Sequence, residues 1–483
     1  MNEERNQRLL IQNAGHVYTA NPDRDVYNNI DILIEGGKIS QIGSNISREV
    51  TDVDRRIDAT DMVVIPGMVN THHHLFQTLY RGIDIIKKRP IVEWVQNMSS
   101  LLDGLDDEAA YSAACVGMAE LILSGCTTTS DHLYVYPHGR TSIFDATIEA
   151  SRDLGMRFHP VRGNLSRNQK GDSSWKPFVL EDDDLVLSNI QEVIQKYHDS
   201  SRFSMCQVGV GPCAYYSGSD ELFRQVAELA RKWQVRLHTH AFEDPNEDEE
   251  CRRIFSRSAL EFLESVGFLG SDVWLAHGVG AQEKEIQTFA DTHTSVAHTP
   301  WCSTSKKRIT RVEQMLRAGV NVSLGTDGSA SNDSSNMLLE ARLAGRMQGM
   351  NPDNDGVSYY RATQILELAT IGGARSLGRQ DEIGSIEHGK AADLAIIDIT
   401  KRLECTGFGN PLESVFHSGL TTVDYTIING RVVVDRGNLV TMNGLGLTEI
   451  IRNHNHIAEA IRKRAEGTLG KPLSVGWVRA FLK

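Results

Sequence analysis

Residues 66–74 have the sequence Pro-Gly-Met-Val-Asn-Thr-His-His-His, which places three histidines directly after a short apolar segment. We interpret residues 68–74 as a β-strand. Successive side chains of a strand point to opposite faces, so His72 and His74 point the same way while His73 points away from them. Two imidazoles on one face can bind one metal ion, and we therefore expect His72 and His74 to be metal ligands.

Three later segments have the same arrangement of ligand-type side chains after a short apolar run. They are His238-Thr239-His240, Leu275-Ala276-His277-Gly278 and Gly325-Thr326-Asp327-Gly328. We expect His240 and Asp327 to complete the ligand set, with His238 as a further ligand or as a support for one. Three imidazoles and a carboxylate with an exchangeable water are typical of a hydrolytic metal centre. One divalent ion is expected, zinc in the first place and iron as the alternative.

Strand and helix patterns alternate between residues 67 and 383. The expected strands are 68–74, Cys126–Asp131, Arg157–Gly163, Met205–Pro212, Val235–His240, Asp272–Gly278, Ser295–Pro300 and Asn321–Asp327. Eight such units in one run predict a (β/α)8 TIM-like barrel, an α/β fold whose catalytic residues lie at the carboxyl ends of the strands. The ligand candidates fall at these ends, on the first, fifth, sixth and eighth strands.

The two ends of the chain are rich in short strands and turns. Gly36-Gly37 and Asn429-Gly430 are typical of hairpin turns. Because chain termini often lie close together, we expect residues 1–66 and 384–445 to form one small β-sandwich domain. Residues 446–483 are expected to form a C-terminal helical extension.

The composition excludes several classes of protein. Lys and Arg total 50 against 63 for Asp and Glu, a net charge of −13, which argues against a nucleic-acid partner. Seven cysteines without a CxxC pair do not resemble a disulfide framework. The sequence has no signal-peptide pattern and no run of about 18 apolar residues, so we expect a cytoplasmic protein without a membrane span. We also expect a homo-oligomer, a dimer or larger.

The residue types at the predicted site suggest a separate catalytic role for each of Asp327, Glu243 and His277. A bound divalent ion lowers the pKa of its water to about 7. Asp327 is expected to be both a ligand and a proton acceptor. Glu243, three residues beyond His240, is expected to protonate a ring nitrogen of the substrate, and His277 to stabilise the oxygen on which charge develops.

These motifs resemble those of the amidohydrolase superfamily, and within it the branch that deaminates cyclic amidines. The matching segments are residues 66–81, 238–240, 274–278, 325–337 and 383–394. The resemblance covers nearly the whole chain. It implies one divalent metal ion, usually zinc or iron, held by His72, His74, His240 and Asp327. It also matches Glu243 and His277 to the acid/base and polarising residues of the family, and Gln77 to a substrate contact.

The resemblance implies a planar heterocycle with an N=C–NH₂ or N=C–NHR unit as substrate. The expected reaction is metal-dependent hydrolytic deamination of an oxo-substituted aminopurine, aminopyrimidine or s-triazine. The side chains expected to bind oxo groups are Gln77, Arg81, Arg162 and Asn164. Those expected to stack on the ring are Phe76, Trp94, Tyr134 or Trp301.

Two alternatives stay open. One is a triazine hydrolase that removes chloride or an alkylamine, and the other is an inactive barrel that serves as a binding protein. The expected fourth strand, within residues 205–213, has no lysine to bridge two metal ions, which favours a single ion. The pairs Ala241-Phe242 and Trp301-Cys302 depart from the family pattern in loops that follow barrel strands, and such loops set substrate choice.

Overall fold

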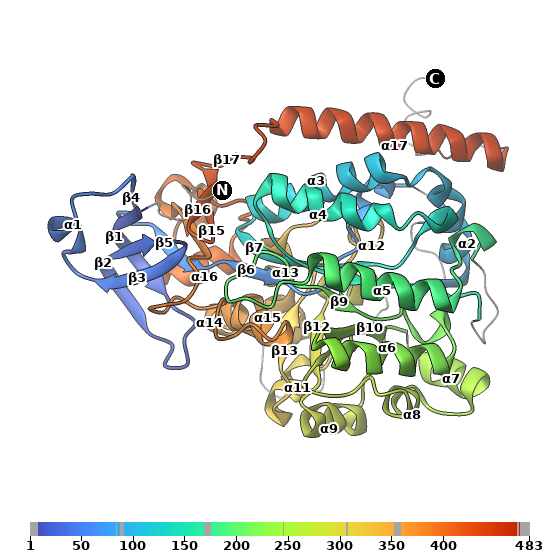
Figure 1. The fold of residues 1–483 in the computed structure, drawn as a ribbon. Coiled ribbons are helices and arrows are strands. Elements are labelled where there is room, and N and C mark those ends of the chain that lie inside the picture. The colour runs from blue at the N-terminus through green and yellow to red at the C-terminus, as the bar shows by residue number, and fades with distance from the viewer. Residues whose placement is uncertain are drawn as a thin grey trace, which may run out of the picture.

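The structure is a computed structural model that describes residues 8–83, 85–86, 91–168, 175–244, 246–305, 308–351, 359–470 and 473. It contains a barrel of parallel strands wrapped by helices. A second sheet built from the two ends of the chain lies at one side of the barrel (Figure 1).

Eight parallel strands follow one another around the barrel in chain order, so the expected barrel is confirmed. They are β6 (Met68–Asn70), β7 (Cys126–Leu133), β8 (Arg157–Arg162), β9 (Gly209–Val210), β10 (Arg236–Ala241), β11 (Val273–His277), β12 (Ser295–His298) and β13 (Val322–Leu324). The last strand meets the first through backbone hydrogen bonds from Thr71 N to Leu324 O (3.0 Å) and from Asp327 N to His72 O (3.0 Å). These bonds lie beside the ligand candidates and bring the first and eighth segments together.

Several strands are shorter than the sequence predicts. The first strand ends at Asn70 and the eighth at Leu324. The chain leaves the sheet at these points, and Asp327 adopts the left-handed backbone conformation, with φ of 60°. His72, His74 and Asp327 therefore lie on the turns beyond the strands, where a side chain can point back over the mouth of the barrel.

Helices cover the outside of the barrel (Figure 1). They are α2 (Ile91–Leu101), α3 (Asp107–Leu123), α4 (Ser142–Leu154), α5 (Asp183–Tyr197), α6 (Asp220–Trp233), α7 (Glu247–Phe255), α8 (Ala259–Ser265), α9 (Glu283–Thr292), α10 (Pro300–Ser305), α11 (Val312–Ala318), α12 (Ser329–Asn332), α13 (Met337–Met347), α14 (Ala362–Ala369) and α15 (Ile371–Ser376). The helix α3 begins with acidic residues, and the Asp106 side chain before it accepts a hydrogen bond from Ala109 N.

The ends of the chain form one mixed sheet of nine strands. Its strands are β1 (Arg8–Tyr18), β2 (Val26–Glu35), β3 (Lys38–Gly43), β4 (Arg55–Asp58), β5 (Val63–Pro66), β14 (Leu394–Ile397), β15 (Tyr425–Ile428), β16 (Arg431–Asp435) and β17 (Asn438–Leu439). The two ends meet where β5 pairs with β14 in antiparallel fashion. Side chains of β1, β2, β14 and β15 share one buried apolar cluster, so this sheet encloses a core of its own. A short helix, α1 (Ile46–Glu49), and α16 (Pro411–His417) lie in the same two regions of the chain.

The C-terminal helix α17 (Leu447–Leu469) runs along the barrel beside α3 (Figure 1). His454 on this helix is buried, and its Nε2 lies 3.2 Å from Thr78 O. Within the described part of the chain, no helix is both long enough and apolar enough to cross a membrane.

One buried ion pair connects the barrel to the second sheet. The guanidinium of Arg157, on β8, donates from Nε to Asp393 Oδ2 (2.8 Å) and from Nη2 to Asp393 Oδ1 (3.0 Å). Both side chains are almost fully buried, at 0% and 2% exposure. Asp393 also accepts a hydrogen bond from Asn429 N at 2.7 Å, and Arg157 donates to Ser204 O at 2.7 Å. Every charged atom of the pair is therefore matched by a partner.

Replacing Asp393 with Asn should lower the free energy of unfolding by about 3 kcal/mol, because it leaves the Arg157 cation buried without its counter-charge. Urea denaturation followed by circular dichroism measures the change. As a control, Glu459→Gln on the exposed face of α17 breaks the surface pair with Lys463 and should leave the midpoint unchanged. Equal midpoints for D393N and the unmodified protein would contradict this account.

Candidate metal centre

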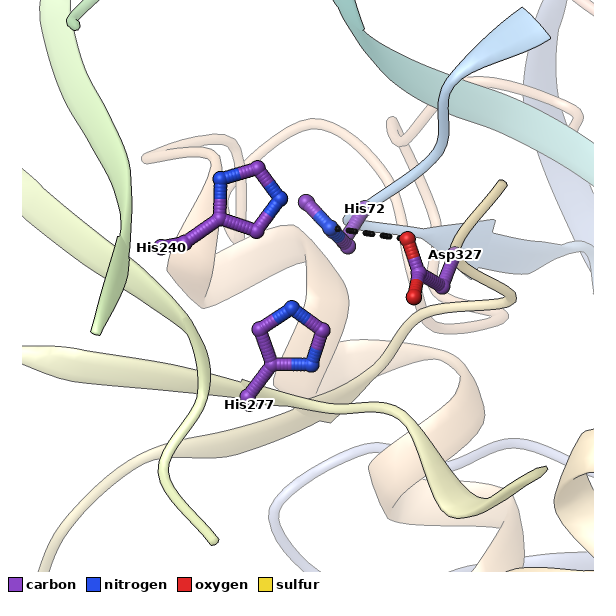
Figure 2. Close-up of side chains that lie close together, drawn as sticks. All are labelled: His72, His240, His277 and Asp327. Carbon is purple, nitrogen blue, oxygen red and sulfur yellow. Dashed lines mark ion pairs between the residues drawn. The ribbon is translucent and has the colours of Figure 1, made fainter. Parts of the chain in front are cut away.

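The ligand-type segments of the sequence meet in one buried cluster at the carboxyl ends of the strands. Ligand atoms of His72, His240, His277 and Asp327 all lie within 4.8 Å of one another (Figure 2). His74 belongs to the same cluster, because its Nε2 lies 3.0 Å from His240 Nε2 and 3.3 Å from Asp327 Oδ1. The structure thus brings together His72, His74, His240 and Asp327.

Backbone carbonyl groups determine which ring nitrogen of two histidines carries the proton. His74 Nδ1 lies 2.8 Å from His132 O, and His240 Nδ1 lies 2.6 Å from Cys213 O. A carbonyl oxygen only accepts hydrogen bonds, so each Nδ1 must donate. In the neutral ring, Nε2 then carries no proton, and its lone pair is available to a metal ion.

The tautomer of His72 is also determined by a backbone carbonyl group, which acts through the ring of His238. His238 Nδ1 lies 2.7 Å from Trp274 O and therefore donates to it, which leaves His238 Nε2 as an acceptor. His72 Nδ1, at 2.8 Å, donates to that nitrogen. The Nε2 of His72 keeps its lone pair, and it has no hydrogen-bond partner among the described residues.

The Nε2 lone pairs of His72, His74 and His240 therefore point towards the Asp327 carboxylate, and no proton lies between these atoms. His72 Nε2 lies 3.4 Å from Asp327 Oδ1. Tetrahedral ligands at the usual zinc–nitrogen distance are separated by about 3.3 Å, close to the spacings of this cluster. Burial and the neighbouring histidines hold the pKa of His72 and of His74 well below the ordinary range, so both rings are neutral, as metal ligands must be. The residues present fit a divalent ion of the zinc or iron type.

Asp327 is held as an anion by its surroundings. Burial acts to raise the pKa of its carboxyl group, but His277, His74 and the Cys302 thiol outweigh this effect and bring the pKa to about 2. Cys302 Sγ donates to Asp327 Oδ2 at 2.8 Å, while Oδ1 is the oxygen that faces the histidines. The two oxygens of this carboxylate thus have different neighbours.

The turn that carries Asp327 is supported on both sides. A Cβ atom at Gly325 would lie 2.7 Å from the Cβ of His72, so only glycine allows the first and eighth segments to approach this closely. Beyond Asp327, the Asn332 amide donates to Thr326 O, on the turn itself, at 2.5 Å and to Glu340 Oε1 at 2.8 Å. Burial raises the pKa of Glu340 to about 8.

Glu243 lies beside the cluster and faces His277, one of its members. His277 Nε2 is 3.8 Å from Glu243 Oε2, and His277 Nδ1 is 2.8 Å from Thr299 Oγ1. The Glu243 side chain is 26% exposed, whereas that of His277 is 1% exposed. The Glu243 carboxyl group therefore lies on the solvent side of the cluster and is not one of the groups that surround the Nε2 atoms.

The residues expected to bind substrate are not all in one place. Gln77 is buried, and its Oε1 accepts a hydrogen bond from Ala330 N at 3.3 Å, on the turn after Asp327. Arg81 Nη2 donates to Glu120 Oε2 (2.6 Å) and Ser335 Oγ (3.1 Å). The Trp301 side chain is exposed at 46%.

Arg162 is used differently from what the sequence suggests. It is fully buried and donates to both oxygens of Glu181, at 3.0 and 2.5 Å, and to Asn189 Oδ1 at 2.9 Å. Its guanidinium also lies 3.9 Å from the ring centre of Tyr136. The structure does not bring Arg162 into the ligand cluster, and the ion pair with Glu181 accounts for its burial. Asn164, also buried, donates to Ser217 O at 3.4 Å.

Aromatic side chains line one side of the cluster. The ring of Tyr134 lies edge-on to His74, with centroids 4.9 Å apart, and Phe76 lies 5.6 Å from Tyr134. Trp175 continues the row at 6.4 Å from Tyr134, and Trp94 lies 6.5 Å from Trp175. Trp175 and His132 were missed by sequence reasoning, because neither of them repeats the His-X-His or Thr-Asp-Gly pattern.

Comparisons with known proteins agree with this geometry. Residues 63–433 match the model of the amidohydrolase family. The chain is 33% identical to 8-oxoguanine deaminase of Pseudomonas aeruginosa, over 94% of this chain and 99% of that protein. It is also 33% identical to hydroxydechloroatrazine ethylaminohydrolase of Pseudomonas sp. strain ADP, over 87% and 90%.

Among solved structures, the chain is similar to atrazine chlorohydrolase from Arthrobacter aurescens TC1 in complex with zinc. The TM-score is 0.86 and the identity 31%, over 93% of this chain and 100% of that one.

The contact between His238 and His72 predicts an effect on metal binding. The unmodified protein, expressed with zinc supplied, should contain close to one equivalent of zinc. His238→Ala removes the acceptor for His72 Nδ1 and should weaken zinc affinity about 10–100-fold, the usual effect of losing a group that orients a ligand. Competition with a zinc-binding dye measures this affinity. His159→Ala, which removes another buried imidazole that packs on Trp274, is the control and should keep the unmodified affinity. Equal affinities for the two variants would refute the orienting role.

Proposed function

The chain belongs to the amidohydrolase family, and on this premise we propose that it is a metal-dependent hydrolase of cyclic amidines. The proposed reaction removes an exocyclic amino group from an oxo-substituted aminopurine, aminopyrimidine or s-triazine. The observation that carries the proposal is the convergence of three unprotonated Nε2 atoms on the Asp327 carboxylate, with the acid Glu243 next to them. The homo-oligomeric state and cytoplasmic location expected from the sequence stay predictions.

We assign His72, His74, His240 and Asp327 as the residues that hold one divalent ion, most simply zinc. When bound, such an ion makes water acidic enough to supply a nucleophile at neutral pH. The relative solved in complex with zinc supports the choice of metal. The absence of lysine from residues 205–213, around β9, supports a single ion.

The protein groups then divide the proton transfers among themselves. Asp327, whose Oδ1 faces His72 and His74, is suited to take a proton from the attacking water. Glu243 is suited to donate a proton to the ring nitrogen next to the reacting carbon, which makes that carbon electrophilic. His277 can receive a hydrogen bond from the Thr299 hydroxyl at Nδ1, which leaves an N–H at Nε2 to stabilise charge on the incoming oxygen.

The surroundings of the cluster favour a flat, polar ring. Tyr134 and Phe76 offer aromatic surface beside His74, on which a heterocycle can stack. We propose that the amide nitrogen of Gln77 contacts a ring oxo group, because its Oε1 is already held by Ala330 N. We propose that Arg81 contributes through its contacts with Ser329 and Ser335, after Asp327, and that the exposed Trp301 ring stacks on the substrate. We do not include Arg162, whose hydrogen bonds are made with Glu181 and Asn189.

A second candidate is removal of chloride from a triazine, the activity named for the zinc-containing structural relative. Glu243 favours deamination over this reaction, since an amine leaves more readily with a proton donor, whereas chloride leaves without one. An inactive binding protein is less consistent with the buried cluster, because burying so many polar groups costs free energy that only a functional site justifies.

Replacing Glu243 with Gln should reduce kcat about a hundredfold or more, the scale of a lost general acid or base, while the zinc content stays near one equivalent. Steady-state kinetics and metal analysis of the same preparation measure both effects. Glu250→Gln, on the outer face of α7, breaks only a surface contact with Arg253 and serves as the matched control. Loss of zinc in E243Q would make Glu243 a ligand instead, and an unchanged kcat would remove it from the mechanism.

Incubation of the zinc-loaded protein with a panel of rings tests the proposed function directly. The panel contains isocytosine, 8-oxoguanine, guanine and hydroxytriazines with amino or alkylamino groups, and release of ammonia or alkylamine is measured. We expect turnover of at least one member. Activity only on a chlorotriazine would establish the dechlorinating alternative, and activity only on a lactone, hydantoin or phosphotriester would refute the assignment.

A further inference from the structure

We propose that Glu247 is a positioning residue that acts through Glu243, by holding the backbone of residues 242–244 in the shape that directs the Glu243 carboxylate towards His277. This inference rests on the proposed catalytic role of Glu243. Glu247 itself lies in the first turn of α7, four residues after Glu243, and has no part in the chemistry.

The carboxyl group of Glu247 is bound by the loop that carries Glu243. Its Oε2 accepts a hydrogen bond from Glu243 N at 2.9 Å. Burial raises the pKa of Glu247 to about 8, and the nearby backbone N–H groups of Phe242, Glu243 and Asp244 act in the opposite direction. The backbone of the loop therefore lies against this one side chain, and the Glu243 amide is its direct hydrogen-bond donor.

The backbone of this loop needs such support. Phe242 has φ of 55°, in the left-handed region that costs a non-glycine residue about 1–3 kcal/mol. On one side, the loop is held by the turn after β11, where Gly278 N donates to Ala241 O (3.1 Å) and Gly280 N donates to Phe242 O (2.7 Å). These bonds fix the carbonyl groups of the loop. Glu247 fixes the Glu243 N–H, which faces the other way.

An ordinary role in helix capping does not explain this contact. Asp248, Glu249 and Glu250 also lie in the first turn of α7, where negative charge stabilises the start of a helix, and none of them is buried. Glu247 differs from them because it is only 5% exposed. Burying a carboxyl group is costly, and the hydrogen bond from Glu243 N offsets part of that cost only in this arrangement of the loop. The loop and the carboxyl group thus stabilise each other.

The geometry connects this contact to the site. The Glu243 amide points to Glu247, while the Glu243 carboxylate lies 3.8 Å from His277 Nε2. A rotation of the backbone at Glu243 would therefore move its carboxylate away from the cluster. A displacement of about 1 Å of a catalytic group can reduce turnover about a hundredfold.

Amide hydrogen exchange tests the structural half of the proposal without any substrate. In Glu247→Ala and Glu247→Gln, peptides that contain residues 242–244 should exchange faster than in the unmodified protein, with zinc content unchanged. Asp248→Asn is the matched control: it alters the next residue of the same helix, whose carboxylate contacts Ala259 N and Arg252, and should leave this exchange unchanged. Equal exchange in the Glu247 variants and the unmodified protein would overturn the proposal.

A double-mutant cycle tests the catalytic half, with the member of the ring panel that is turned over fastest. We expect E247A to lower kcat about 10–100-fold with a change in KM of less than about threefold. The same substitution made in the E243Q protein should have almost no further effect, because Glu247 would have no acid left to position.

Multiplicative losses in the double variant would overturn the proposal, since they would mean that Glu247 acts independently of Glu243. If E243Q itself keeps full activity, the proposed mechanism fails, and the exchange experiment still decides whether Glu247 holds the loop.

Discussion

The hydrogen bonds from histidine Nδ1 atoms to carbonyl oxygens are the interactions on which this site depends. The oxygens of His132 and Cys213 orient His74 and His240 directly, and that of Trp274 orients His72 through His238. All three carbonyls belong to barrel strands or to the segments that leave them. The register of the parallel strands therefore determines where the lone pairs point. A shift in register would misdirect the rings even if every ligand residue were still present.

The backbone at the mouth of the barrel is strained in several places. Phe242, His277 and Asp327 all have positive φ, at 55°, 78° and 60°. Each lies at or just beyond the end of a strand, on a segment that carries a residue of the site: Glu243 after Phe242, and His277 and Asp327 themselves. Such conformations cost free energy and persist only when the surrounding structure enforces them. The buried supports described above, Glu247 for one turn and the Asn332–Glu340 contact for another, meet that requirement.

Much of this arrangement could be predicted from local patterns. Alternation placed His72 and His74 together, and the order of strands brought distant segments to one end of a barrel. The sequence could not show that the strands stop short of these residues, because the deviation depends on contacts between the first and eighth segments. Arg162 illustrates the same limit: it was expected to contact an oxo group of the substrate, but Glu181, nineteen residues later, forms a buried pair with it. The contacts of Cys302 with Asp327 and of His132 with His74 likewise join segments that no local pattern connects.

The pairing of β5 with β14 has a consequence for how the protein is made. Roughly 330 residues separate these neighbours in the chain. At ribosomal rates of 5–20 residues per second, β5 would wait on the order of half a minute for its partner to be synthesised. During that time the apolar edge of the N-terminal sheet is open to other chains, as unpaired edges are prone to aggregate. Because β5 needs β14 as its partner, the newly synthesised chain depends on rapid synthesis of its C-terminal strands or on a chaperone that covers this edge.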